Sequence, residues 1–299
     1  LISNINPQCV ITPYHDVLLP KKSNSNIAVI TVHDLCFKDV PNAYPWLVRT
    51  YYWWMLRRNI ARAHHILTVS ETTKKHLIKE FRVSPNEISV VPNSLPSEFL
   101  KSSYETVSIN EWRNKHGLYG TCIALYTSGV EYRKNVVRLL EAFRKLWSQG
   151  EKINLCITGN LDSRWSHLFT LDELNSGRIQ FLGFLTLSEL RLAYESAHVV
   201  VYPSLCEGFG RACLEAKTCG TPLACSDIEV FHEVAEDYPV YFDPYDIDSI
   251  VTAIKLATEK NRNSFFEDPR YSSQEIEQKF IKIMNGLIGI DDKKSVREH

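Results

Sequence analysis

The stretch Cys122–Trp147, CIALYTSGVEYRKNVVRLLEAFRKLW, carries a strand, a polar loop and a helix in one piece. The run Cys122–Tyr126 is apolar without alternation, as in a strand that is covered on both faces. Asn135, a residue well suited to begin a helix, precedes four apolar side chains at helical spacing. These are Val136, Leu140, Phe143 and Trp147. The stretch therefore predicts one strand–helix unit of a parallel sheet.

The same alternation extends outward through most of the chain. Thr186 and Glu189 have the spacing of a capping box before another amphipathic stretch. Short connections between strands and helices predict an α/β, doubly wound fold. The strands that we expect are Ala28–Val32, Ile66–Val69, Ile88–Val91, Cys122–Tyr126, Leu155–Thr158, Ile179–Leu182, Val199–Tyr202 and Pro222–Cys225.

The polar, turn-rich residues 92–120 indicate a hinge between two lobes. We therefore expect an N-terminal lobe over 1–105, a second lobe over 106–287 and a charged tail over 288–299. The first lobe is shorter than a complete doubly wound domain, and the sequence begins with Leu1 rather than Met. These two observations suggest that the first lobe is truncated.

Composition excludes several classes of protein. The 299 residues are 44% hydrophobic and 23% charged with a net charge of −1, so no global positive field favours nucleic acid. The eight cysteines form no CxxC pair, which argues against a zinc knuckle or a thioredoxin motif. Scattered cysteines in apolar runs are typical of reduced core residues in a cytosolic protein. Neither a signal peptide nor an apolar run long enough to span a membrane is visible.

The strongest chemical signal is Ser204–Glu215, which follows the expected strand Val199–Tyr202. Its two carboxylates, Glu207 in the turn and Glu215 in the next helix, lie about 12 Å apart along a helix, roughly the length of a nucleotide sugar. A carboxylate can accept bonds from vicinal hydroxyls, and free N–H groups at the helix start suit a diphosphate. Gly208 and Gly210 would let the backbone approach a ligand. Two solvated glutamates are an equally good interpretation of the spacing alone.

A second motif, Thr127–Asn135, joins a strand to a helix and contains Gly129, Arg133 and Lys134. Two cations before a helix N-terminus can hold a diphosphate and stabilise the charge that grows on it as a leaving group. A solvated basic turn is the simpler interpretation of these residues when they are taken alone.

A third candidate is His33, at the carboxyl end of the strand Ala28–Val32. Ligands bind at that end of open parallel sheets, and an imidazole can hydrogen-bond a sugar hydroxyl. A lone histidine is more often structural. The neighbouring Asp34 is expected to orient the turn.

Together these segments resemble glycosyltransferase family four. The residues that carry the resemblance are Glu207-Gly208-Phe209-Gly210, Leu214-Glu215-Ala216, Gly220-Thr221-Pro222, Arg133-Lys134-Asn135 and His33-Asp34-Leu35. The resemblance implies a GT-B fold, with two Rossmann-like lobes facing a cleft, and retention of anomeric configuration. It implies that Glu207 binds hexose hydroxyls, that Glu215 binds the ribose and that His33 faces the donor sugar. Arg133 and Lys134 would bind the diphosphate, beside Gly129, Gly208, Phe209 and Gly210.

The sequence departs from the family pattern at three positions. Ala212 replaces a common proline, Lys217 a common methionine and Ser94 the glycine of the P-N-G turn. Lys217 is the departure that could alter contacts with the base. Thr12–His15 resembles an element near the acceptor side, which makes His15 a further candidate.

The implied function is transfer of a hexose from a nucleotide sugar, with GDP-mannose as our guess, to a glycan or lipid-linked acceptor. Such a mannosyltransferase would act in cell-surface polysaccharide or lipopolysaccharide synthesis, in the cytoplasm and without a metal or other cofactor. Two alternatives stay open: a non-catalytic sugar-nucleotide-binding module, and a phosphorylase or epimerase of the same fold.

Residues 38–82 are unusually basic, with nine Lys and Arg against three Asp and Glu, a balance of 9 − 3 = +6. The same region contains Tyr51-Tyr52-Trp53-Trp54. A basic, aromatic helix can lie on an anionic membrane surface, although the aromatics can equally serve as core. A peripheral membrane location is therefore a hypothesis. The Asp246-Ile247-Asp248 triplet more simply begins a helix than binds a metal.

Overall fold

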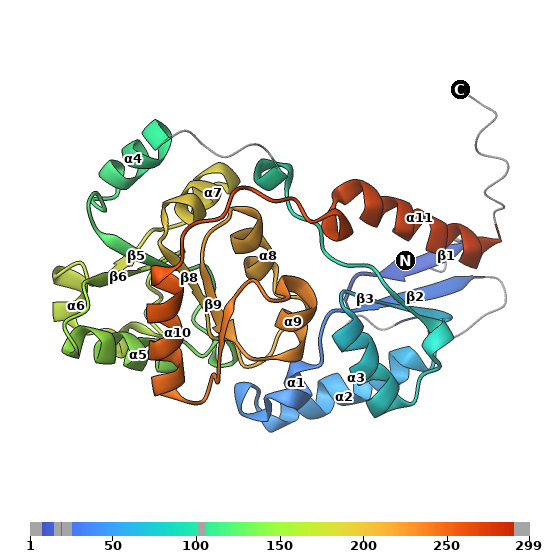
Figure 1. Ribbon diagram of the computed structural model, residues 1–299. Coiled ribbons are helices and arrows are strands. Elements are labelled where there is room, and N and C mark those ends of the chain that lie inside the picture. The colour runs from blue at the N-terminus through green and yellow to red at the C-terminus, as the bar shows by residue number, and fades with distance from the viewer. Residues whose placement is uncertain (1–7, 15–18, 20–25, 101–105, 290–299) are drawn as a thin grey trace. The chain divides into compact units, whose positions relative to one another are not determined.

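The computed structural model describes residues 8–14, 19, 26–100 and 106–289 (Figure 1). Within these ranges the chain forms two parallel sheets, one of four strands and one of six. By their contacts the residues group into two compact units, each of which contains one sheet. The first unit comprises the described residues within 1–94, 207–209 and 269–289, and the second comprises those within 95–206 and 210–268. The described residues of 269–289 group with the first sheet, and the expected lobes over 1–105 and 106–287 stay a prediction.

The first unit has the strand order β1-β2-β3-β4, with every neighbouring pair parallel. Its strands are β1 Cys9–Thr12, β2 Ile27–Val32, β3 His65–Thr68 and β4 Ile88–Val90. Its helices are α1 Cys36–Asp39, α2 Trp46–Ile60, α3 Glu71–Phe81 and α11 Ser273–Ile288. Ser70 caps α3, because its hydroxyl accepts a hydrogen bond from the Thr73 N–H.

Both faces of the first sheet are covered, as the continuous apolar runs predict. Along β2, Ala28, Ile30 and Val32 pack with residues of α2 and α3, while Val29 points to the opposite face. There Val29 and Leu67 pack against Met284 of α11. Figure 1 shows α11 on one side of the strands and α2 and α3 on the other.

The second unit has the strand order β10-β9-β8-β5-β6-β7, again with parallel neighbours. Its strands are β5 Cys122–Tyr126, β6 Ile153–Ile157, β7 Ile179–Phe181, β8 Val199–Tyr202, β9 Leu223–Ser226 and β10 Val240–Phe242. Its helices are α4 Thr106–Lys115, α5 Val136–Ser148, α6 Leu171–Asn175, α7 Leu187–Ser196, α8 Arg211–Thr218, α9 Glu229–Ala235 and α10 Ile247–Glu259. All eight strands expected from the sequence are present, and β1 and β10 are additional.

Helices cover both faces of the six-stranded sheet. The apolar faces of α5 and α10 share one core with inward residues of the strands, including Leu155, Val201 and Phe242. In addition, α7 packs on β5, and α8 packs on β8 and β9. The expected capping box of Thr186 and Glu189 begins α7.

The buried thiols and the helix starts belong to the local features that the sequence predicts. Cys156, Cys219 and Cys225 are buried thiols, as expected of reduced core residues. Cys36 and Cys206 are not among the free thiols of the described residues, so the expectation is wrong for these two. Asp246 begins α10 and accepts the Asp248 N–H, which confirms the simpler interpretation of that triplet. The region 92–120 contains the helix α4, which its polar composition concealed. Among the described residues, no helix has the length and apolar character needed to cross a bilayer.

Candidate functional site

The order of strands in the second unit predicts by itself where a ligand would bind. From β5 the chain moves outward through β6 and β7, then returns to β8 on the other side of β5 and continues through β9 and β10. This reversal between β5 and β8 is the topological switch point of a doubly wound sheet, and ligands bind beyond the carboxyl ends of the strands there. The loops after β5 and β8 contain the two motifs found in the sequence.

The loop after β5 is held in place by its own backbone and by the loop after β8. It contains a 3₁₀ turn, Tyr132–Lys134, and ends at Asn135 in the left-handed conformation with φ 59°. The Asn135 amide does not cap α5 but donates a 2.7 Å hydrogen bond to the Pro244 carbonyl. The Leu205 N–H donates to the Arg133 carbonyl at 2.8 Å, so the two loops are joined.

The two cations of this loop have different surroundings. Arg133 Nε lies 3.0 Å from Glu131 Oε2, and its side chain is partly exposed. Lys134 is buried, and its Nζ donates to the Tyr202 hydroxyl at 3.1 Å. Tyr202 is the last residue of β8, so both switch-point strands contribute to the position of the lysine. Sequence reasoning missed Tyr202, although its position at a strand end was a visible signal.

Glu215 lies within α8 and is 4% exposed. Its Oε2 accepts a 2.6 Å hydrogen bond from the Tyr194 hydroxyl, and its Oε1 lies 3.2 Å from Arg211 Nε. Burial raises the pKa of this carboxyl, while the Tyr194 hydrogen bond and the Arg211 charge oppose the shift. Glu215 is therefore a held, buried carboxylate and not one of two solvated glutamates.

The glycines of the second unit differ in their reason for being glycine. A Cβ on Gly129 would meet no atom within 4 Å, so packing does not require glycine there. A Cβ on Gly210 would lie 2.7 Å from the Phe231 ring, and Gly210 has φ +87°. Gly210 is thus explained by its neighbours without any ligand.

In the first unit, His33 and Gly208 come together. A Cβ on Gly208 would lie only 2.1 Å from the His33 carbonyl oxygen, which accounts for the glycine by close approach of two backbones. The Ser70 hydroxyl donates to the Gly208 carbonyl at 2.6 Å, and the Thr73 hydroxyl donates to the His33 carbonyl at 3.2 Å. The expected approach of Gly208 to a ligand stays a prediction.

The ring of His33 is engaged as well. Its Nε2 lies 2.8 Å from the Pro13 carbonyl oxygen, and its ring centroid is 5.4 Å from that of Tyr14. Asp34 Oδ1 accepts the Cys36 N–H at 2.9 Å, which confirms that Asp34 orients the turn. The structure thus groups His33, Glu207, Gly208 and Phe209 in the first unit. It groups Gly129, Arg133, Lys134, Gly210 and Glu215 in the second.

Comparison with known proteins assigns the family. Residues 108–279 match the model of glycosyl transferases group 1, and residues 12–99 match that of glycosyltransferase family 4. The chain belongs to the glycosyl transferases group 1 family.

Two curated relatives of this family member are bacterial mannosyltransferases. The O-antigen chain mannosyltransferase RfbU of Salmonella typhimurium is 30% identical over 257 residues, which are 85% of this chain and 66% of the relative. The O-antigen chain mannosyltransferase B of Escherichia coli is 31% identical over 227 residues, 75% of this chain and 59% of the relative. The chain therefore spans about two thirds or less of the length of these relatives.

Solved structures show that this group 1 chain has the GT-B fold. Sucrose-phosphate synthase of Thermosynechococcus elongatus is similar with a TM-score of 0.75 at 17% identity, over 97% of this chain and 76% of that one. WaaG, a glycosyltransferase involved in lipopolysaccharide biosynthesis, is similar with a TM-score of 0.69 at 17% identity, over 99% and 77%. Anabaena HepE in complex with UDP and glucose is similar with a TM-score of 0.67 at 17% identity, over 87% and 72%.

Two of the departures from the family pattern, Lys217 and Ser94, have described surroundings or backbone conformations. The buried ammonium of Lys217 lies 2.8 Å from Glu236 Oε2 and 3.2 Å from Asp268 Oδ2, so two carboxylates engage the group expected to alter base contacts. The backbone at Ser94 does not have the positive φ that would favour a glycine there. The candidate His15 lies outside the described residues.

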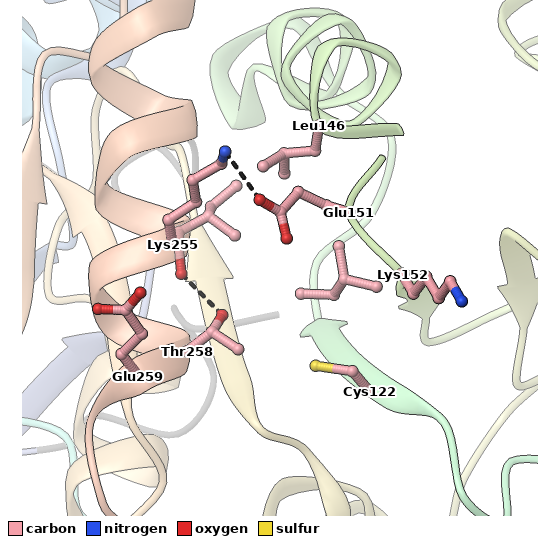
Figure 2. A pocket seen from close by; sticks show the side chains of 9 residues that line it. Cys122, Leu146, Glu151, Lys152, Lys255, Thr258 and Glu259 are labelled. Atoms are coloured by element: carbon pink, nitrogen blue, oxygen red, sulfur yellow. Dashed lines mark hydrogen bonds and ion pairs between the residues drawn. The ribbon is translucent and has the colours of Figure 1, made fainter. Parts of the chain in front are cut away.

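Outside the two motifs, a metal centre or a pocket could also bind a ligand. Among the described residues, no group of three or more His, Cys, Asp or Glu is arranged to hold a metal ion. A pocket of about 260 Å³ opens beside Cys122 and Ile153, the first residues of β5 and β6 (Figure 2). Lys255 Nζ and Glu151 Oε1, 2.8 Å apart, form an ion pair at this pocket. It lies at the amino ends of the strands, opposite the switch-point edge.

Proposed function

We propose that this protein is a retaining glycosyltransferase that moves a hexose from a nucleoside-diphosphate sugar to a glycan or lipid-linked acceptor. The acceptor would belong to a cell-surface polysaccharide such as a lipopolysaccharide. The observation that carries the proposal is the switch point of the second unit, where Arg133, Lys134 and Glu215 come from the two motifs that flank β5 and β8. The names of the two curated relatives support the same reaction and favour mannose.

The chemistry that this site offers is stabilisation of a leaving group. As the anomeric bond breaks, negative charge grows on the departing nucleoside diphosphate. A guanidinium and a buried ammonium in one turn are suited to hold that charge, and both are ordered by hydrogen bonds before any ligand binds. The enzyme's contribution would be positioning and electrostatics, with no protein nucleophile.

Replacing both cations tests this role. The double variant Arg133→Ala, Lys134→Ala is expected to lose roughly 100-fold or more in the rate of transfer, as loss of charge stabilisation does elsewhere. Lys145→Ala, which removes an exposed cation of α5 paired with Asp248, is the matched control. Radiolabelled sugar transfer to an isolated glycolipid acceptor fraction gives the rate, and proton NMR of the product gives its anomeric configuration. Full activity of the double variant, or an inverted product, would overturn the proposed mechanism.

The donor is the second element of the proposal. Calorimetric titration with GDP, UDP and ADP should select one nucleotide, which we propose is GDP, and Glu215→Ala should weaken its binding. The HepE complex with UDP makes UDP the most informative competitor. Selective binding without any transfer would indicate a non-catalytic module, and phosphorolysis in the absence of nucleotide would indicate a phosphorylase.

We further propose that transfer needs no metal, as the resemblance implies. Treatment with EDTA should leave the rate unchanged, measured in the same transfer assay. Loss of activity that Mg²⁺ or Mn²⁺ restores would contradict this part of the proposal.

Peripheral attachment to the cytoplasmic face of a membrane is the remaining part, and α2 supports it. Tyr52 and Trp53 pack against the core of the first unit, whereas Tyr51 and Trp54 are 47% and 51% exposed. Leu47, also exposed, lies on the same helical face one turn before Tyr51. Arg58 lies 5.4 Å from the Trp54 ring centroid at the end of this face. Exposed aromatics beside cations are typical of helices that lie in an anionic interface.

Flotation with liposomes tests this surface. The wild type should float with vesicles that contain phosphatidylglycerol and much less with phosphatidylcholine alone, and Tyr51→Ala, Trp54→Ala should reduce flotation. The matched control is Tyr119→Ala, Phe184→Ala, which removes two exposed aromatics from the second unit. Equal flotation of both variants, or none by the wild type, would contradict a role for α2.

A further inference from the structure

Tyr194 connects the two sequence motifs of the second unit, although it belongs to neither. It lies in α7, and its side chain is fully buried. Its hydroxyl lies 2.6 Å from Glu215 Oε2 and 2.8 Å from Thr127 Oγ1. Thr127 is the first residue after β5 and begins the loop that contains Arg133 and Lys134. One hydroxyl therefore contacts both the buried carboxylate and the start of the cationic loop.

The direction of these hydrogen bonds follows from the number of protons. A neutral phenol has one proton to donate, and an ionised carboxylate can only accept. Burial raises the pKa of Tyr194 well above its ordinary value, so the phenol keeps its proton. Tyr194 must therefore donate to Glu215 and accept from Thr127. The chain runs from Thr127 through Tyr194 to Glu215.

This arrangement leaves part of Glu215 available. Oε1 faces Arg211 at 3.2 Å and Oε2 accepts from Tyr194, which uses one acceptor position on each oxygen. A carboxylate has about four such positions, so about two remain for the hydroxyls of a ligand. Fixing the other two restricts the direction in which the remaining positions point.

Tyr194 is itself held firmly. Its backbone carbonyl accepts from the Thr221 hydroxyl at 2.8 Å and from Arg262 Nη2 at 3.3 Å. Its ring meets that of Phe99 edge to face at 5.8 Å between centroids. Contacts on several sides leave the phenol little freedom to turn away. A small displacement of Glu215 therefore displaces Thr127 through Tyr194, and the reverse holds as well.

We propose that Tyr194 is a positioning residue that aims Glu215 at the ribose of the donor and couples it to the diphosphate-binding loop through Thr127. This inference rests on the proposed nucleotide-sugar donor. It adds that the ribose and the diphosphate are bound cooperatively, through a residue that contacts neither of them.

Calorimetric titration with GDP, UDP and ADP, followed by the 2′-deoxy form of the nucleotide that binds, tests the inference. Tyr194→Phe keeps the ring and removes the donor, so we expect affinity for the ribonucleotide to fall about 10-fold, as for one hydrogen bond to a charged group. Affinity for the 2′-deoxynucleotide should fall less, so that discrimination between the two sugars shrinks. A purely structural role would weaken both nucleotides equally and would leave this ratio unchanged.

Two further variants keep the test decisive. Thr127→Val, which removes the hydroxyl, should reduce ribonucleotide affinity about 3-fold, whereas Thr127→Ser should restore it. These carry the test if thermal unfolding shows that Tyr194→Phe does not fold. Tyr241→Phe, which removes a hydroxyl bonded to the Glu236 carbonyl, is the control and should bind both nucleotides as the wild type does.

The outcomes distinguish failure of the proposed function from failure of the proposed role of Tyr194. If the wild type binds no nucleotide, the proposed function and this inference both fall. If it binds one nucleotide and Tyr194→Phe binds both sugar forms with unchanged affinity or an unchanged ratio, only the role of Tyr194 is overturned.

Discussion

The loops that follow β5 and β8 contain the glycines of two neighbouring motifs, but they use those glycines differently. Gly129 after β5 is exposed, and a Cβ there would meet open space. Gly208 and Gly210 after β8 are buried, and a Cβ on either would collide with the protein itself. The comparison teaches that packing accounts for the two buried glycines without any ligand, whereas packing gives no reason for a glycine at the exposed position.

The largest effect among Gly129, Gly208 and Gly210 should come from Gly208. Gly208→Ala places a methyl group 2.1 Å from a backbone oxygen of His33, which cannot rotate away. We expect about 3 kcal/mol of destabilisation in urea unfolding. Gly286→Ala in α11, where a Cβ meets nothing, should instead stabilise by about 0.5 kcal/mol. Equal stability of the two variants would remove the packing explanation.

Gly210→Ala should have the next largest effect. Its cost combines a left-handed backbone at φ +87° with a contact to the Phe231 ring, for which we expect about 2 kcal/mol. The Phe231 ring, unlike a backbone oxygen, can be replaced with a smaller side chain. Gly210→Ala should therefore cost less stability in a Phe231→Leu background than in the wild type, as measured in a double-mutant cycle of thermal unfolding. Strict additivity would show that the contact does not matter.

Gly129→Ala should show the opposite behaviour. Its free energy of unfolding should change by less than about 0.5 kcal/mol, because no neighbour is touched. Its affinity for the nucleotide should fall about 10-fold, or about 1.4 kcal/mol, if the diphosphate occupies the open space. Unchanged affinity in calorimetry would mean that the donor stays away from this glycine.

The smallest and most diagnostic effect concerns pH at Glu215. Because burial raises the pKa of this carboxyl, protonation begins at a higher pH than for an exposed glutamate. Nucleotide affinity should be constant above that raised pKa and fall as the pH drops through it. The contribution of Glu215 to folding stability should be largest at low pH and should be lost as the pH rises through the raised pKa. The reason is that the folded state binds this proton more tightly than the unfolded state.

Glu215→Gln should abolish this acid limb of binding while other groups continue to titrate. The charged or titratable groups that act on Glu215 are Tyr194 and Arg211, and Cys219 senses its charge. Burial raises the pKa of both Tyr194 and Cys219, so neither of them produces an acid limb. An acid limb that persists in Glu215→Gln would assign it to another residue.

Much of the fold was visible in the sequence, for a physical reason. Eight strands were predictable because parallel strands covered on both faces are continuous apolar runs. The two that were missed, β1 and β10, are short strands at sheet edges, and only Thr12 and Phe242 in them are buried. The helix α4 was missed because its sequence is polar.

The candidate site was predictable only where its residues lie in a local motif. The prediction of Arg133, Lys134 and Glu215 rests on local motifs that resemble the family, because loops at strand ends and carboxylates at helical spacing are sequence patterns. Tyr194 could not be found in this way, since a buried aromatic within an amphipathic helix has the signature of a core residue. The role that we propose for it depends on two contacts with residues far away in the sequence.

The path of the chain through the first unit has a consequence for its synthesis. The apolar face formed by Val29 and Leu67 is covered by α11, which the ribosome makes only after the whole second unit. At roughly 5–20 residues per second, that interval lasts on the order of 10 to 30 seconds. The first sheet must therefore leave the ribosome with one side uncovered, and the emerging chain would be a substrate for chaperones until its last described helix arrives.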